Sequence, residues 1–166
     1  KRYARGRTIR GAIDALGGQQ SLAVGRTHGI GRHLITMNGA QAGLLADGRR
    51  LHLQHGPIDL IVEAFGPSKE ISTAYKQARN RFETLLAELV VELSDLRKPA
   101  KERRAEVHGA TAVRMIDAVW PHRETFVTPM AAVAGAVADE VMEALLIGRS
   151  LEKAYINNSG DIAVYL

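Results

Sequence analysis

Residues 42–66, AGLLADGRRLHLQHGPIDLIVEAFG, decide the fold that the sequence predicts. Two turn signals, Asp47-Gly48 and Gly56-Pro57, separate three short runs in which apolar and polar residues alternate. Alternation places the apolar side chains of each run on one face of a strand. The segment therefore predicts a three-stranded antiparallel meander with one buried face.

A long amphipathic pattern follows the meander. Ser68 is placed to cap a helix, Glu70 supplies negative charge in its first turn, and Lys98-Pro99 ends the pattern. The apolar positions that recur at steps of three and four are Ile71, Tyr75, Ala78, Phe82, Leu85, Leu89, Leu93 and Leu96. This spacing predicts one helix over 68–98 that packs on the sheet.

Two further helices are expected downstream. One runs over 110–120 and is stopped by Pro121, and the other starts at Thr128-Pro129 and ends at Gly148. The first amide N–H groups of a helix have no partner within it, so its start can bind an anion. Small side chains that would admit a flat ligand or a neighbouring helix are those of Ala131, Gly135 and Ala138.

The last segment, LEKAYINNSGDIAVYL (151–166), is typical of a strand, a tight turn and a second strand. Asn and Gly tolerate the left-handed conformations that a tight turn needs. Residues 157–161, NNSGD, are thus explained as a turn, with the edge of a ligand site as the alternative. The predicted fold class is α/β in the α+β sense: an antiparallel meander packed against long helices and ending in a β-hairpin.

Composition narrows the class of protein. The chain has 166 residues, of which 46% are hydrophobic, and this suits one globular domain with its own core. It has no cysteine, which excludes disulfides, thiolate zinc sites and cysteine nucleophiles. No apolar run approaches the roughly 20 residues that span a bilayer. A cytoplasmic protein without membrane contact is expected.

Charge is unevenly distributed along the chain. Residues 1–36 hold seven of the 22 Lys and Arg residues but one of the 18 acids, Asp14, so they carry +6 and the remainder −2. Such an arm can bind phosphate backbones, but an extension foreign to the domain explains it as well. We expect the domain to cover 37–166 and nucleic acid not to be its main partner.

Several common catalytic motifs are missing. The sequence contains no GxxxxGK[ST], HExxH or GxSxG pattern, so phosphate-loop hydrolysis, zincin proteolysis and the α/β-hydrolase mechanism have no support. His52 and His55 are three apart in a predicted strand and should point to opposite faces. We therefore predict no metal site from the histidines.

The chain resembles an uncharacterised bacterial and archaeal family related to ApbE in three segments that occur in the same order. These segments are LLADGRRLHLQHGPIDLIVEAFG, TPMAAVAGAVADEV and INNSGDIAVYL. ApbE proteins, also called thiamine biosynthesis proteins, are FAD:protein FMN transferases. The resemblance covers 37–166 and implies a layered ApbE-like fold with a flavin-nucleotide site. In that family the last motif commonly has Gly where this chain has Ser159.

The resemblance also implies a set of ligand-binding residues. Those expected to contact FAD or FMN are Thr128, Pro129, Met130, Asn157, Asn158, Ser159, Gly160 and Asp161. The transferases need Mg²⁺, whose ligands are expected beyond Leu166, so the chain resembles the N-terminal part of a longer domain and is expected to be inactive by itself. In a complete protein an acceptor hydroxyl would attack the FMN-side phosphorus, with AMP leaving.

Three functions are compatible with these patterns. The first is a flavin-nucleotide protein that, at full length, transfers FMN to a threonine of an acceptor protein. The second is a non-catalytic ligand-binding or assembly domain of the same fold, which includes a homo-oligomer. The third is nucleic-acid binding through residues 1–36.

Overall fold

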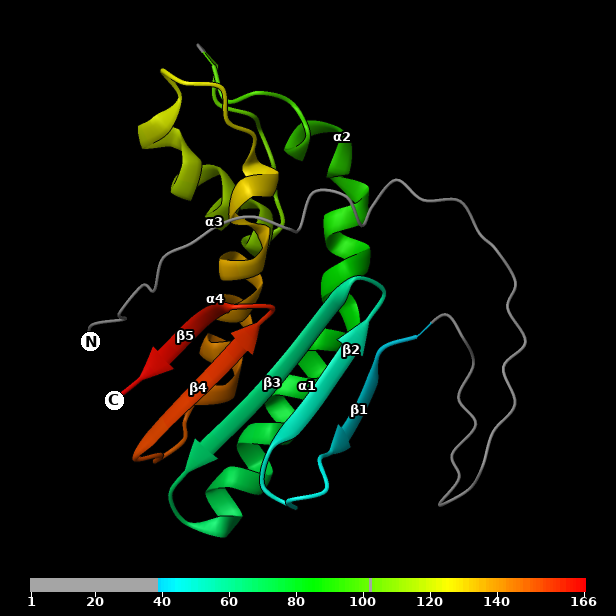
Figure 1. Ribbon diagram of the computed structural model, residues 1–166, viewed down its shortest axis with the longest axis vertical. Coiled ribbons are helices and arrows are strands. Elements are labelled where there is room, and N and C mark those ends of the chain that lie inside the picture. Colours follow the sequence, from blue (N-terminus) through cyan, green and yellow to red (C-terminus); the bar gives the residue numbers. More distant parts are fainter. Residues whose placement is uncertain (1–38, 102) are drawn as a thin grey trace.

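The computed structural model describes residues 39–101 and 103–166, and its centre is one antiparallel sheet. The strands run in the spatial order β1-β2-β3-β4-β5, and each neighbouring pair is antiparallel (Figure 1). Their bounds are Gln41–Leu44 (β1), Leu51–His55 (β2), Ile58–Phe65 (β3), Lys153–Asn158 (β4) and Asp161–Tyr165 (β5). The C-terminal hairpin β4-β5 thus extends the N-terminal meander into a five-stranded sheet.

The meander forms as the alternation predicts. Leu53 lies opposite Leu60 in the β2-β3 register, and both are fully buried. Gly48 and Gly56 adopt positive φ angles of 66° and 55° in the two turns, a conformation that glycine adopts without steric cost. The two turn signals are confirmed, and so is the buried face of β2 and β3, whereas all four residues of β1 are exposed.

Helices cover one face of the sheet. α1 and α4 lie side by side across it, and α3 packs against α4 and α1 near their ends (Figure 1). The helices are Ser68–Val91 (α1), Leu93–Leu96 (α2), Ala110–Val119 (α3) and Val133–Leu146 (α4), with 3-10 turns at Trp120–His122 (η2) and Pro129–Ala132 (η3). The predicted α+β class is therefore correct.

The long helix differs from its prediction at both ends. Pro67 occupies the N-cap position and Ser68 is the first helical residue, so Ser68 caps nothing. The helix stops at Val91, and the carboxylate of the next residue, Glu92, accepts hydrogen bonds from the backbone N–H groups of His108 (2.5 Å) and Gly109 (3.1 Å). These contacts hold Glu92 at the start of α3, and the chain continues as the separate short helix α2.

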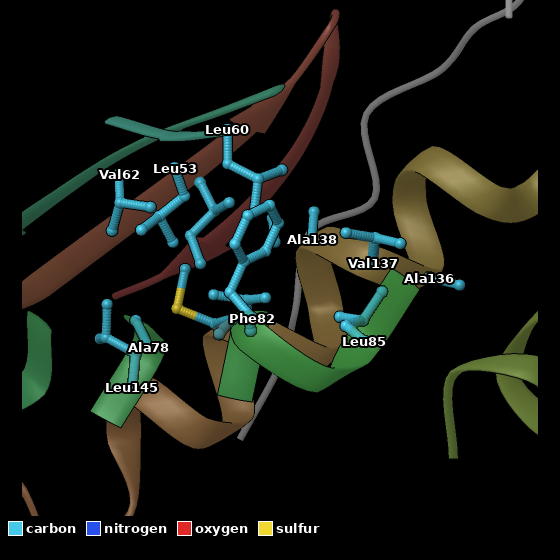
Figure 2. Packing of buried hydrophobic residues seen from close by; sticks show 14 of the residues in the cluster. Leu53, Leu60, Val62, Ala78, Phe82, Leu85, Ala136, Val137, Ala138 and Leu145 are labelled. Carbon is cyan, nitrogen blue, oxygen red and sulfur yellow. The ribbon is translucent and has the colours of Figure 1, made fainter. Parts of the chain in front are cut away.

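The hydrophobic core lies between the sheet and the helices. Phe82 of α1, 1% exposed, sits under Leu53, Leu60 and Val62 of the sheet and beside Leu85 and Val137 (Figure 2). Burial of apolar side chains at about 25 cal/mol per Å² is the main force that holds such layers together. The apolar stripe predicted for α1 is thus core, as expected.

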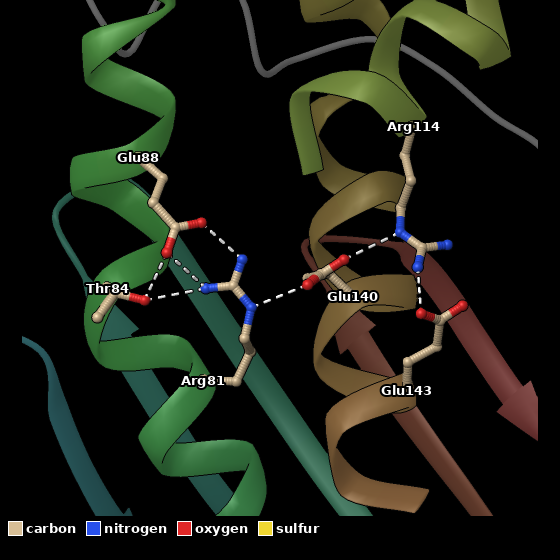
Figure 3. A network of polar contacts seen from close by, with 6 residues as sticks. All are labelled: Arg81, Thr84, Glu88, Arg114, Glu140 and Glu143. Carbon is tan, nitrogen blue, oxygen red and sulfur yellow. Dashed lines mark hydrogen bonds and ion pairs between the residues drawn. The ribbon is translucent and has the colours of Figure 1, made fainter. Parts of the chain in front are cut away.

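A polar network ties the helices together on their outer side. The Glu140 side chain of α4 accepts hydrogen bonds from Arg81 Nε of α1 (2.8 Å) and Arg114 Nε of α3 (3.0 Å) (Figure 3). Arg81 also binds Glu88, and Arg114 also binds Glu143. One buried carboxylate therefore joins three helices.

None of the described helices covers the other face of the sheet (Figure 1). On this face the Tyr155 hydroxyl donates to Glu63 Oε2 at 2.6 Å, and this hydrogen bond raises the pKa of Tyr155. His52 lies on the same face, 3.1 Å from Asp59, whereas the ring of His55 stacks edge-on against Phe82 in the core. The two histidines point to opposite faces, as predicted.

Within residues 39–101 and 103–166, no helix is at once long enough and apolar enough to cross a bilayer. The basic arm, residues 1–36, lies outside the described part of the chain.

Candidate functional site

The segment 157–161 is the turn of the β4-β5 hairpin. Ser159 and Gly160 occupy its two central positions with φ angles of 51° and 107°, and Asn158 pairs with Asp161 across it. Positive φ at both central residues identifies a type I′ turn, the form that matches the twist of paired strands. Asn157 Oδ1 accepts a hydrogen bond from the Gly160 N–H at 2.9 Å. The interpretation as a turn is correct.

The hairpin also contacts the helix that carries the other predicted site residues. Asn158 is 5% exposed, and its Nδ2 donates to the carbonyl oxygen of Ala134, in the first turn of α4, at 3.0 Å. Asp161 lies opposite Asn158 in the register, so it shares the face of the sheet that the helices cover. The structure therefore brings the hairpin and the start of α4 together.

The contact between Asn158 and Ala134 leads to a testable prediction about stability. Asn158→Ala removes a buried hydrogen bond between hairpin and helix, and we expect the free energy of unfolding to fall by about 1 kcal/mol. Asn157→Ala is the matched control, because its side chain lies on the open face and bonds only within the turn. Urea unfolding of both variants measures the difference, and equal losses would contradict a role for the Asn158 contact.

The start of α4 differs from the prediction. Thr128 is extended (φ −115°, ψ 156°) and precedes the 3-10 turn η3, and its side chain caps no N–H group. The α-helix proper begins at Val133. Within η3 the N–H of Ala131 bonds to Thr128 O, and the N–H of Val133 bonds to Met130 O. Because the tighter turn uses these donors itself, the free amides expected at Thr128-Pro129 are fewer than an α-helix would offer.

The strip of small residues predicted at Ala131, Gly135 and Ala138 spans η3 and α4 and is not continuous. Ala131 is exposed and Ala138 is fully buried in the core, whereas a Cβ added at Gly135 would meet no atom within 4 Å. Tight packing therefore does not require the glycine. The strip does not form one surface on which a flat ligand could lie.

A pocket of about 360 Å³ lies next to the start of η3. Pro129, one of the predicted residues, lines it together with Trp120, which follows α3. The remaining lining comes largely from the connection between α2 and α3, where a backbone hydrogen bond from Ala100 N to Val127 O (2.8 Å) holds the chain beside η3. The hairpin residues do not line this pocket, so the predicted residues fall into two separate places.

Three basic side chains line the pocket: Lys98, Arg103 and Arg104. Each forms an ion pair at the surface, Lys98 with Asp95 at 2.8 Å, Arg103 with Glu106 at 2.5 Å, and Arg104 with Asp117. The hydrogen bond from Lys98 lowers the pKa of Asp95. Exposed pairs of this kind contribute little to stability, so an incoming anion could replace the carboxylates at small cost.

Trp120 supplies an aromatic surface at the same place. The Arg123 guanidinium lies 5.0 Å from its ring centroid, a cation–π contact that helps to fix the ring. Sequence reasoning missed both Trp120 and the basic residues. The signal was present, since residues 97–104 contain five Lys or Arg, but nothing in the pattern places this run beside Pro129.

The described residues do not fit a metal ion. Across residues 39–101 and 103–166, no group of three or more His, Asp or Glu side chains could hold one. The Mg²⁺ ligands were expected beyond Leu166, so the described residues leave that prediction untested; among them Asp161 on the hairpin belongs to no such group.

Comparison with known proteins corrects the family. Residues 42–166 match the model of a family described as AbpE bacteria. This is a different family name from ApbE, and nothing found supports kinship with FAD:protein FMN transferases, so the resemblance drawn from the three segments was wrong. No curated protein and no solved structure matches the chain. The contacts in the structure do not test flavin binding, the transfer of FMN or the acceptor protein. These three remain predictions.

Proposed function

We propose that this chain, which belongs to the family described as AbpE bacteria, is a binding protein for a phosphate-bearing aromatic ligand, with a flavin nucleotide as the ligand class. The proposal rests on the pocket that Pro129 lines together with Trp120 and the basic residues Arg103 and Arg104. An aromatic ring can stack on the indole, and guanidinium groups bind phosphate oxygens in pairs.

The size of the pocket favours the smaller flavin nucleotide. A volume of about 360 Å³ is near the lower end for ligand pockets. The ring and single phosphate of FMN would fit it more fully than the whole of FAD, whose adenosine half would extend outside. Apolar side chains such as Ile116 complete the lining and give the ring a surface to bury.

The ligand should report its own binding through Trp120, the single tryptophan of the chain. We expect FMN to quench tryptophan fluorescence in a saturable manner, with FAD weaker than FMN. Riboflavin is the matched control ligand, because it keeps the ring and lacks the phosphate. Its affinity should be about tenfold lower than that of FMN if a charged contact to phosphate contributes about 1.4 kcal/mol.

A pair of variants locates the phosphate contact. Arg104→Gln should weaken FMN binding about tenfold and leave riboflavin binding unchanged. Arg79→Gln is the matched control, since Arg79 is exposed on α1, pairs with Glu83 and does not line the pocket. Isothermal titration calorimetry measures both. The proposal is wrong if neither flavin nucleotide binds, or if Arg104→Gln weakens riboflavin binding as much as FMN binding.

A further inference from the structure

Two of the three basic residues that line the pocket at Trp120 have carboxylate partners that line it as well. Lys98 pairs with Asp95 at 2.8 Å. Arg103 pairs with Glu106 at 2.5 Å, and both side chains of this pair are largely exposed. A phosphate in the pocket would meet both charges of each pair, so these carboxylates would repel it while their partners attract it.

Arg104 is held differently. It lines the same pocket, but its carboxylate partner, Asp117, does not. Asp117 belongs to α3, a helix whose Met115 and Ile116 are buried in the core. Arg104 belongs to the irregular connection before that helix. The ion pair therefore joins the connection to a helix that the core fixes in place, and its negative charge stays outside the pocket lining.

A phosphate can bind Arg104 without displacing Asp117. A guanidinium has five N–H donors in a fixed planar arrangement, and Arg104 contacts Asp117 through Nη2. The donors on its other nitrogens remain for phosphate oxygens. Because a side chain that is already held in place loses less freedom when the ligand arrives, such an ion pair favours binding.

We propose that Asp117 positions Arg104 for the phosphate of the ligand, and that Glu106 competes with that phosphate. This inference rests on the proposed function, because it assigns roles around the same pocket. The two carboxylates carry the same charge, and each pairs with an arginine of the lining. They nevertheless act in opposite directions, since Asp117 lies outside the lining and Glu106 is part of it.

Two variants that each remove one negative charge test the inference. Asp117→Asn should weaken FMN binding about fivefold, the upper range for an exposed ion pair, and leave riboflavin binding unchanged. Glu106→Gln should strengthen FMN binding about threefold, because Arg103 then faces the phosphate without a competitor. A general effect of charge would strengthen FMN binding in both variants, so positioning alone predicts opposite signs.

Isothermal titration calorimetry on the whole chain measures these affinities. Glu83→Gln is the matched control, because Glu83 is exposed on α1, pairs with Arg79 and does not line the pocket. It should change neither FMN nor riboflavin binding.

A double variant separates positioning from a general loss of structure. In a chain that carries Arg104→Gln, the further change Asp117→Asn should have no effect on FMN binding, because the guanidinium that Asp117 holds is gone. Asp117→Glu keeps the carboxylate and should retain more of the affinity for FMN than Asp117→Asn does.

The outcomes distinguish this inference from the proposed function. If Arg104→Gln weakens FMN binding alone but Asp117→Asn leaves it unchanged or strengthens it, the inference is wrong and the proposed function stands. The inference is also wrong if Asp117→Asn weakens riboflavin binding equally, or if Glu106→Gln weakens FMN binding. If neither flavin nucleotide binds the unmodified protein, both are wrong.

Discussion

Phe82→Ala is expected to lower the free energy of unfolding by about 3 to 5 kcal/mol, the range for removing a buried aromatic ring. Phe82 is 1% exposed and lies between the sheet and α4 (Figure 2). Its neighbours Leu53 and Leu60 are fixed by the β2-β3 register, and Val137 is fixed by α4. Because the sheet, α1 and α4 all meet at this ring, its removal leaves a cavity that neighbours held by their own elements fill only in part.

The matched control is the same substitution on the surface. Phe126 is 82% exposed in the segment before η3, so Phe126→Ala should change the free energy of unfolding by no more than about 0.5 kcal/mol. Chemical denaturation monitored by circular dichroism measures both variants, and the slope of the transition checks that each remains cooperative. Similar effects for the two variants would mean that Phe82 is not the centre of the core.

The parts of the fold that follow local rules could be predicted from the sequence. The meander needs alternation and two glycine turns, and Gly48 and Gly56 adopt the positive φ angles that the turn signals imply. The type I′ turn at Ser159-Gly160 follows from residues that tolerate left-handed backbone. Each of these features is specified within about ten residues, which is the range in which sequence patterns act.

Features that depend on distant contacts could not be predicted. The break after Val91 has no proline or glycine to mark it, and it coincides with the contact of Glu92 to the N–H groups of His108 and Gly109. The pocket at Trp120 lies where a hydrogen bond from Ala100 N to Val127 O joins two segments of the chain. One sequence does not show which amides Glu92 binds or which carbonyl oxygen accepts the hydrogen bond from Ala100, because many such groups are available.

The candidate site also combines one feature that could be predicted from the sequence with one that could not. Sequence order placed the hairpin and the start of α4 in one site, and the Asn158 contact to Ala134 does bring them together. Pro129, however, turns toward a pocket that the hairpin does not line. The order of motifs reports which elements belong to the domain, but it does not report which side chains share a cavity.

Glu140→Gln is expected to cost about 2 to 3 kcal/mol, because it removes the charge between two partly buried guanidinium groups. Arg81 and Arg114 each keep a second carboxylate, Glu88 and Glu143 (Figure 3). This keeps the expected loss below that of an arginine left without any partner. Glu143→Gln is the matched control: its side chain is 51% exposed, and its loss should be below about 1 kcal/mol.

The dependence of this effect on pH distinguishes charge from shape. Burial alone would raise the pKa of Glu140, but hydrogen bonds from Arg81 and Arg114 outweigh it and hold the pKa below its ordinary value of 4.5. A carboxyl whose pKa is lower in the folded state stabilises the fold above its unfolded pKa, and loses this contribution as pH falls through the folded pKa. The difference between the unmodified protein and Glu140→Gln should therefore be constant near neutral pH and begin to shrink below about pH 4.5, where the unfolded chain takes up the proton. It should be lost once the pH falls through the lower pKa of the folded state, where protonated Glu140 resembles glutamine. A difference that stays constant down to the acid unfolding transition would mean that packing of the side chain, and not its charge, joins α1, α3 and α4.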